Sequence, residues 1–192
     1  MFVYITPKPF QHLMVNDAQF EDIYNEHKKL VYNLCLQYVL NTEDARDITQ
    51  EVFVKVYQRH NQHDPTLASL KTWIYRITIN HCLDFLKARK SKKRFGFISS
   101  LFHADSNEPI EDASNVDHPG IQSEDKEAMQ NLLLIIQSLP ENQKTAIILT
   151  KIEDRPQLEV AEIMNTSVKA VESLLQRAKQ TIQKKLTETE GL

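Results

Sequence analysis

The scarcity of glycine constrains this chain more than any other feature of its sequence. Gly96, Gly120 and Gly191 are its only glycines among 192 residues, whereas average usage is about 7%. Glycine-rich phosphate loops, Rossmann-type turns and tight hairpins all need backbone conformations that glycine adopts most easily. We therefore expect an all-α fold.

Composition and apolar runs limit the class of protein further. Apolar residues make up 41% of the chain, enough for one medium domain or two small ones with a buried core. The longest apolar runs, 1–5 and 132–136, are far shorter than the roughly 20 residues that span a bilayer. No secretory signal pattern is visible, so we expect a cytoplasmic protein without membrane insertion. Cys35 and Cys82 lie far apart in the sequence and are expected to be small buried hydrophobes.

An acidic segment separates two helical parts. Residues 96–125 contain Gly96 and Gly120, no Lys or Arg, and seven acids: Asp105, Glu108, Glu111, Asp112, Asp117, Glu124 and Asp125. This composition predicts a flexible linker that acts as a spacer, or alternatively as a negative shield for a basic surface. We divide the chain into an N-terminal extension (1–15), a first domain (16–95), this linker (96–125) and a second domain (126–188).

Apolar spacing predicts three helices before the linker. Residues 20–38 repeat apolar side chains at steps of three and four, which is typical of one buried helical face. Asn41 supplies an N-cap for a second helix that runs to about Arg59. Pro65 interrupts the pattern, and a third helix follows from Leu70 toward Arg89. The first domain is therefore expected to be a small helical bundle.

The second domain has the pattern of a helix-turn-helix. An apolar stripe at 129–139 precedes a helix that starts at Pro140, and helices at 157–164 and 168–186 follow. Asn165 tolerates the left-handed backbone of the turn, and Ser167 can cap the last helix. The helix at 168–186 can lie in the major groove of DNA. Alternatively, the two helices joined by this turn only pack against each other. Five basic residues and one acid within 167–185 favour DNA.

A basic stripe covers residues 71–94, where eight basic residues accompany the single acid Asp84. Such a stripe attracts phosphates by counterion release, and Trp73 and Tyr75 could stack on unpaired bases. The alternative is that Trp73 belongs to the core and the basic tail is only solvated. The combination of basic and aromatic residues suggests single-stranded nucleic acid as the ligand, and the six basic residues within 87–94 count against a merely solvated tail.

Other chemistry has little support in the sequence. The helix around residues 44–57 carries a mixed acidic and apolar patch that suits either a basic partner helix or solvent. His60 and His63 have no further ligands nearby, so no metal is expected. No catalytic triad order, paired carboxylate motif or phosphate loop is present. We expect neither an enzyme nor a cofactor or small-molecule substrate.

Four segments resemble bacterial sigma factors of the extracytoplasmic-function class. In region 2, the segment DARDITQEVFVKVY (44–57) resembles the family's polymerase-binding helix. The segment SLKTWIYRITINHCLDFLKARK (69–90) resembles its minus-ten helix. The minus-thirty-five-reading helices of region 4 resemble SLPENQKTAIIL (138–149) and VAEIMNTSVKAVESLLQRAKQTI (160–182). The likeness covers 18–93 and 127–186, and both regions occur in the family's order.

The resemblance implies three groups of site residues. Those expected to bind core polymerase are Asp44, Asp47, Gln50, Glu51, Phe53 and Val54. Those expected at the melted minus-ten element are Lys71, Trp73, Arg76, Asn80, Lys87, Arg89 and Lys90. Those expected at the minus-thirty-five element are Ser167, Lys169, Glu172, Ser173, Gln176, Arg177 and Lys179.

The function implied by this resemblance is promoter selection. The chain would bind the clamp helices and the flap of core RNA polymerase, direct it to promoter DNA and assist melting, under the control of an anti-sigma factor. One alternative is a stand-alone helix-turn-helix regulator that binds duplex DNA without polymerase. Another is a helical adaptor, which would have no salt-dependent affinity for DNA.

Overall fold

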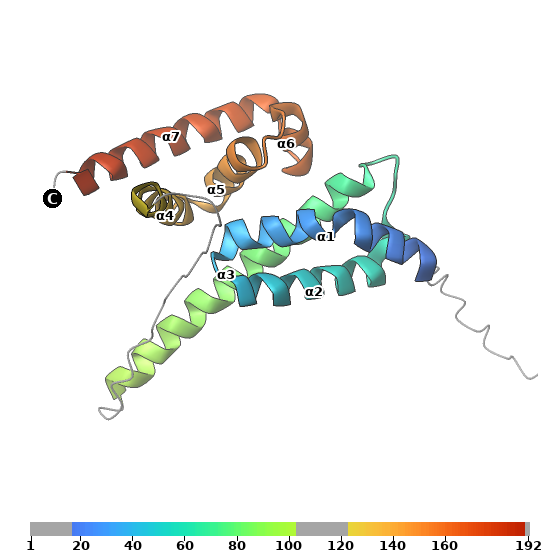
Figure 1. Ribbon diagram of the computed structural model, residues 1–192, viewed down its shortest axis with the longest axis horizontal. Helices are drawn as coiled ribbons and strands as arrows, with labels where there is room; N and C mark the ends of the chain where they lie inside the picture. The colour runs from blue at the N-terminus through green and yellow to red at the C-terminus, as the bar shows by residue number, and fades with distance from the viewer. Residues whose placement is uncertain (1–16, 103–122, 191–192) are drawn as a thin grey trace, which may run out of the picture.

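The computed structural model describes residues 17–102, the first half, and residues 123–190, the second half, and its regular structure there is entirely helical. The first half contains α1 (Asp17–Val39), α2 (Thr42–Arg59), a short 3-10 helix (His60–Gln62) and α3 (Leu70–Phe102). The second half contains α4 (Ser123–Gln137), α5 (Glu141–Ile147), a π-helical segment (Ile148–Ile152), α6 (Gln157–Ile163) and α7 (Val168–Glu190). The all-α prediction is confirmed for these residues, and Figure 1 shows their arrangement.

Short polar signals set several helix ends, as the sequence predicts. The Asn41 side chain accepts a hydrogen bond from the backbone N–H of Asp44 at 2.9 Å and so caps α2. Asn165 adopts the left-handed φ of 50° in the turn between α6 and α7. The Ser167 hydroxyl accepts from the N–H of Ala170 at 3.2 Å. The conformation of Asn165 and the cap at Ser167 confirm the helix-turn-helix geometry of α6 and α7.

The first half is a bundle in which α1 packs against α2 and α3. Val31 and Leu34 of α1, Val52 of α2 and Ile74 of α3 are completely buried. Each such side chain contributes roughly 1.5–3 kcal/mol when it leaves water. This packed core therefore fixes the positions of the outward faces of α2 and α3.

Helices α3 and α4 extend into both ends of the predicted linker. The third helix continues past Arg89 to Phe102, and α4 already begins at Ser123. Residues 90–102 contain no proline and are rich in Lys, Arg and other residues compatible with a helix; Gly96 costs about 1 kcal/mol there relative to alanine. Most of the acidic linker and the extension 1–15 lie outside the described residues, and the domain limits stay a prediction.

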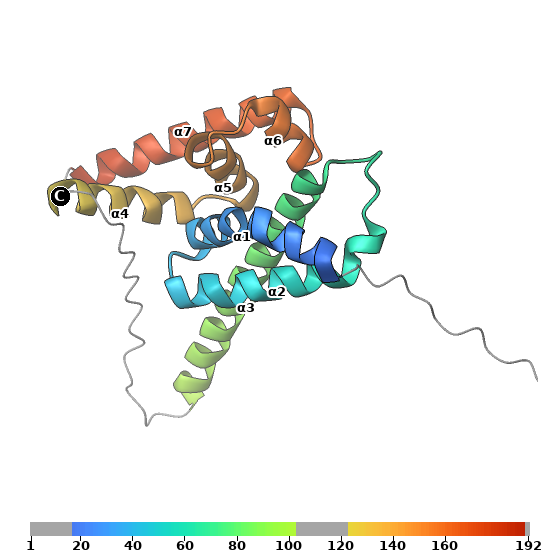
Figure 2. The same cartoon turned by 45° about the vertical axis from the view of Figure 1, so that its right-hand side comes forward.

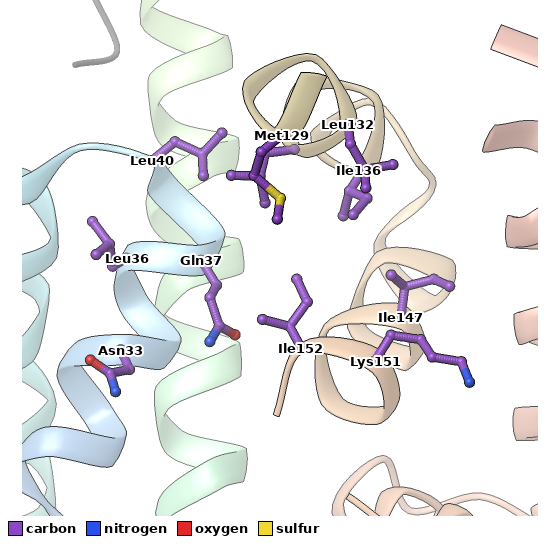
Figure 3. A pocket seen from close by; sticks show the side chains of 11 residues that line it. Asn33, Leu36, Gln37, Leu40, Met129, Leu132, Ile136, Ile147, Lys151 and Ile152 are labelled. Carbon is purple, nitrogen blue, oxygen red and sulfur yellow. The ribbon is translucent and has the colours of Figure 1, made fainter. Parts of the chain in front are cut away.

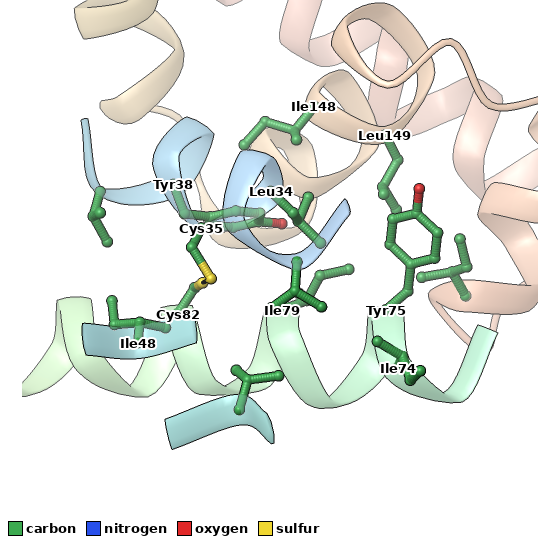
Figure 4. Close-up of a cluster of buried hydrophobic side chains, with 14 of the residues drawn as sticks. Leu34, Cys35, Tyr38, Ile48, Ile74, Tyr75, Ile79, Cys82, Ile148 and Leu149 are labelled. Atoms are coloured by element: carbon green, nitrogen blue, oxygen red, sulfur yellow. Dashed lines mark hydrogen bonds between the residues drawn. The ribbon is translucent and has the colours of Figure 1, made fainter. Parts of the chain in front are cut away.

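The two halves pack against each other. Buried side chains from both form one continuous hydrophobic cluster. Ile148 and Leu149 of the π-helical segment are fully buried and point toward the first half, near Leu34 and Tyr75 (Figure 4). Figure 2 shows α5 and α6 beside α1 and the amino-terminal part of α3, in agreement with the contacts between α3 and α6. Sequence periodicity says nothing about this arrangement.

Candidate nucleic-acid interface

Part of the basic face of α3 lies against the second half. Lys71 pairs with Glu159 of α6, with 3.8 Å between Nζ and Oε1. Lys87 pairs with Glu141 of α5, with 3.3 Å between Nζ and Oε2. Both pairs are partly exposed, so each contributes little free energy, typically below about 1 kcal/mol. They nevertheless show that two cations predicted to bind DNA face protein carboxylates here.

Arg76 binds the carboxyl end of α6. Its Nη2 donates to the backbone carbonyl of Glu162 at 2.6 Å, and its Nε donates to that of Ile163 at 3.3 Å. The last carbonyls of a helix lack intrahelical partners and carry partial negative charge, which suits a guanidinium. Arg76 therefore joins α3 to the first helix of the helix-turn-helix.

Glu153 accepts hydrogen bonds from two helices of the first half. Its carboxylate accepts from Gln37 Nε2 of α1 at 2.5 Å and from the Tyr75 hydroxyl of α3 at 3.2 Å. Burial and the neighbouring Glu153 charge raise the pKa of Tyr75 above its usual value. In addition, the buried Tyr38 hydroxyl donates to Thr145 Oγ1 at 2.8 Å. The contacts of Lys71, Lys87, Arg76, Glu153 and Tyr38 with the opposite half are called the closed interface below.

The remaining predicted minus-ten residues have varied surroundings. Trp73 is half-buried against the core and its ring lies 5.3 Å from that of His63; stacking of its ring on an unpaired base stays a prediction. Asn80 is exposed beside the junction of the halves. Arg89 pairs with Asp44, with 3.2 Å between Nη1 and Oδ2. Lys90 is exposed.

The docking patch predicted on α2 is largely accessible. Asp47, Gln50, Glu51 and Val54 line a shallow hollow of about 470 Å³ together with Lys55 and Gln58. Asp44 is half-buried through its pair with Arg89. Phe53 differs from these residues, because it is only 4% exposed; its contact with polymerase stays a prediction.

Phe53 belongs to an aromatic cluster of the core. Its ring lies edge-on to Tyr24 at 4.7 Å and to Phe20 at 6.5 Å between centroids. Such aromatic pairs contribute about 0.5–1.5 kcal/mol beyond area burial. In the free chain Phe53 therefore packs beneath α2 against these rings.

His81 is a part of this surface that sequence reasoning missed. Its ring nitrogens lie 2.6 Å from Lys55 Nζ and 2.6 Å from Glu51 Oε2. Since an ammonium group can only donate, Nδ1 accepts from Lys55 and Nε2 donates to Glu51. The side chain of His81 thus holds two polar residues of α2 in place. Their separation in the sequence left no periodic signal of this contact.

Most of the residues predicted to read the minus-thirty-five element are exposed on α7. Lys169, Glu172, Gln176, Arg177 and Lys179 are exposed, whereas Val171 and Ala178 are buried. The Arg177 guanidinium donates to Ser173 Oγ at 2.9 Å and so curls back along its own helix. Ser167 is occupied in capping.

An apolar hollow of about 620 Å³ opens between the halves (Figure 3). Leu36 of α1 and Leu40, just after the end of α1, line one side, while Met129 and Ile136 of α4 and Ile152 of the π-helical segment line the other. Met129 and Ile152 are partly exposed there. The hollow is thus an accessible apolar surface at the junction.

Within residues 17–102 and 123–190, no group of three or more His, Cys, Asp and Glu side chains could hold a metal ion. No helix in this part of the chain is long and apolar enough to cross a membrane.

Comparisons with known proteins identify the two halves. The model of Sigma-70 region 2 matches residues 23–92, and that of Sigma-70 region 4 matches residues 129–182. An ECF RNA polymerase sigma-E factor of Haemophilus influenzae is 30% identical over 179 residues, which cover 87% of each chain. This chain belongs to the extracytoplasmic-function sigma factors. The family and helical class expected from the sequence are therefore confirmed.

Further relatives agree with this assignment. The ECF sigma factor SigW of Bacillus subtilis is 29% identical over 171 residues, covering 87% of this sigma factor and 88% of the relative. Among solved structures, CnrH in complex with the cytosolic domain of CnrY has a TM-score of 0.60 at 18% identity, with 91% of both chains covered. RpoE in complex with the anti-sigma factor NepR from Bartonella quintana has a TM-score of 0.61 at 18% identity, covering 88% of this sigma factor and 97% of that chain. The last two likenesses concern the fold. The chain is an RNA polymerase sigma factor, a class of non-enzymatic initiation factors.

Proposed function

We propose that the sigma factor acts by binding alone, through separate surfaces for polymerase and for promoter DNA. The exposed patch of α2 (Asp47, Gln50, Glu51 and Val54) contacts the clamp helices of core polymerase, while the second half contacts the flap. The basic face of α3 holds the melted minus-ten strand, and the outward face of α7 reads the minus-thirty-five element. The observation that carries this division is the match of region 2 and region 4 to the two halves in order.

Promoter binding requires the halves to separate. Lys71, Arg76 and Lys87 contact the second half in the closed interface, so a DNA strand that binds the same groups must displace those contacts. We assign the free chain to a closed state and the promoter-bound chain to an open one. Polymerase supplies the binding free energy for this change by favouring the open state.

An anti-sigma factor is the proposed regulator. Two solved structures with the same fold contain CnrH with CnrY and RpoE with the anti-sigma factor NepR. In this chain the apolar hollow of Figure 3 suits a protein partner, because it is lined by both halves. A partner seated there would hold the closed state. The protein would work where core polymerase works, in the cytoplasm.

The direct test of the proposed function is co-elution with purified bacterial core polymerase, followed by transcription from a random promoter library. Capture with selective transcription is the expected result and yields the promoter consensus. A folded, uninhibited chain that is not captured would contradict the proposal. Tight binding of the free chain to a palindromic duplex would instead indicate the stand-alone regulator.

The α2 patch can be tested by reversing its charge. Asp47→Lys combined with Gln50→Ala is expected to weaken capture by core polymerase about fivefold, since about 1 kcal/mol of interface contacts is lost. Binding is measured by titration of a labelled chain. Asp22→Lys, an equal charge change at an exposed site on α1, serves as the control. Equal affinities for both variants, with unchanged helicity, would remove α2 from the docking surface.

The α7 face can be tested through Arg177. Arg177→Ala is expected to weaken upstream-element binding about tenfold, within the roughly 1–3 kcal/mol of a good base contact. The measurement is transcription from selected promoters whose minus-thirty-five element is intact or scrambled. Lys184→Ala, farther along α7, should have a smaller and sequence-independent effect. Full activity of the Arg177 variant on every promoter would exclude this side chain from the site.

A further inference from the structure

The only two cysteines of the chain meet in the core of the first half. Cys35 lies on α1 and Cys82 on α3, 47 positions apart in the sequence, and their sulfur atoms are 3.8 Å apart. Both side chains are completely buried, and Figure 4 shows the two sulfur atoms adjacent between the helices. A disulfide needs an S–S distance of about 2.05 Å. Bond formation therefore requires the sulfurs to approach by less than 2 Å in total.

The two thiols are not equivalent. The Cys82 thiol donates a hydrogen bond to the Cys35 sulfur. This bond lowers the pKa of Cys35 despite burial, while the same contact and burial raise the pKa of Cys82. Since the thiolate is the reactive form, Cys35 is the sulfur that reacts first with an oxidant.

We propose that Cys35 and Cys82 form an oxidation site, which a hydroperoxide such as hydrogen peroxide converts to a disulfide between α1 and α3. In the first step the Cys35 thiolate attacks one peroxide oxygen, the O–O bond breaks, and Cys35 sulfenic acid and hydroxide are formed. In the second step the Cys82 sulfur, after giving up its proton, attacks the Cys35 sulfur. The S–O bond breaks and water leaves, so that two thiols and one peroxide yield one disulfide and two waters.

Burial determines the rate and the outcome of this chemistry. Only a small oxidant that enters during local opening can reach the pair, so we expect slow oxidation compared with an exposed thiol. Once a sulfenic acid exists, the neighbouring thiol is much closer than a second peroxide. The pair therefore favours the reversible disulfide over irreversible sulfinic acid.

The disulfide would tie together the helices that carry the closed interface. Tyr38, which contacts Thr145 of the second half, lies one turn after Cys35 on α1. Arg76, which holds the end of α6, lies on α3 with Cys82. The cross-link closes a long loop in the unfolded chain, which stabilises the folded first half.

The test uses the full-length chain treated with hydrogen peroxide and then unfolded in the presence of a thiol-alkylating reagent. We expect intact mass to fall by two hydrogen atoms, alkylation to fall from two sites to none, and a peptide joining Cys35 to Cys82 to appear. A dithiol reductant should restore both sites. The urea midpoint of the oxidised chain should lie above that of the reduced chain.

Variants and product analysis make the result decisive. Cys35→Ala and Cys82→Ala should each lose the mass change and leave one free thiol, with circular dichroism as the check on folding. For the unaltered chain, three products would overturn the proposal: two unmodified thiols while an added free cysteine is fully oxidised, sulfinic acid at either position, or disulfide-linked dimers. These readouts do not depend on the assignment as a sigma factor.

Discussion

Glu153→Ala is expected to raise the affinity of the free chain for core polymerase ten- to thirtyfold. The variant removes a carboxylate that accepts hydrogen bonds from Gln37 and Tyr75 across the closed interface. Hydrogen bonds to a charged group contribute about 1.5–3 kcal/mol, and about 1.4 kcal/mol corresponds to a factor of ten. The apparent dissociation constant falls as the open fraction of the free chain rises. Titration of a labelled chain against core polymerase measures this apparent dissociation constant.

A matched control separates opening from a general change of charge. Glu21→Ala removes an exposed carboxylate from α1 and should leave the affinity unchanged. Both variants should retain the helical circular dichroism of the parent. Unchanged or weaker capture by a folded Glu153 variant would mean that the closed interface does not compete with polymerase.

Lys144→Met is expected to stabilise the protein by about 1–3 kcal/mol near neutral pH. Lys144 lies on α5, is only 4% exposed, and donates from Nζ to Gln137 Oε1 at 3.0 Å. Burial, followed by repulsion from Lys90, lowers its pKa from 10.5 to about 8, with partial compensation from Glu141. Each unit between these pKa values corresponds to about 1.4 kcal/mol of destabilisation by the charged group. Solvent screening and loss of the hydrogen bond to Gln137 reduce the gain expected from its removal.

The effect of Lys144 has a defined pH dependence. Below about pH 8 the side chain is charged in both the folded and the unfolded state. The folded state then bears the full free-energy cost of the buried charge. Between about 8 and 10.5 the unfolded chain holds the proton that the folded chain has lost, so the stability of the parent rises with pH. The advantage of Lys144→Met should therefore shrink over this range.

Urea unfolding of parent and variant at about pH 7 and about pH 10 checks this expectation. Lys184→Met replaces an exposed lysine on α7 and should change stability by no more than about 0.5 kcal/mol. A Lys144 variant that is less stable than the parent at both values would show that the ammonium group is well compensated in the folded state.

Local features of the fold are predictable because their causes lie within a few residues. The cap at Asn41, the left-handed Asn165 and the apolar repeats of α1 and α7 each leave a short pattern in the sequence. The exposed face of α7 follows from the same reasoning, since Val171 and Ala178 fix which side is buried. Helix-turn-helix geometry thus emerges from sequence alone.

Long-range contacts leave no such pattern. Tyr38 and Thr145 are 107 positions apart, and Arg76 and Glu162 are 86 apart, so periodicity could not show that part of the basic face of α3 lies against the second half. The contact between Cys35 and Cys82 was invisible for the same reason. The burial of Phe53 was not foreseen either, because a family motif identifies a helix but does not tell which of its apolar side chains points inward.

In the proposed mechanism the closed interface exists in the free chain and breaks on promoter binding. A carbodiimide couples a lysine directly to a nearby carboxylate, and this chain offers two such pairs across the interface, Lys71 with Glu159 and Lys87 with Glu141. Lys184 and Glu188, 3.9 Å apart within α7, provide an internal control. Peptide mass spectrometry quantifies each cross-link in monomeric free protein and in the complex with core polymerase and promoter DNA. We predict that both interface cross-links form in the free chain and disappear in the complex, while the α7 cross-link remains in both. Equal yields of the interface cross-links in the two states would contradict opening of the closed interface on promoter binding.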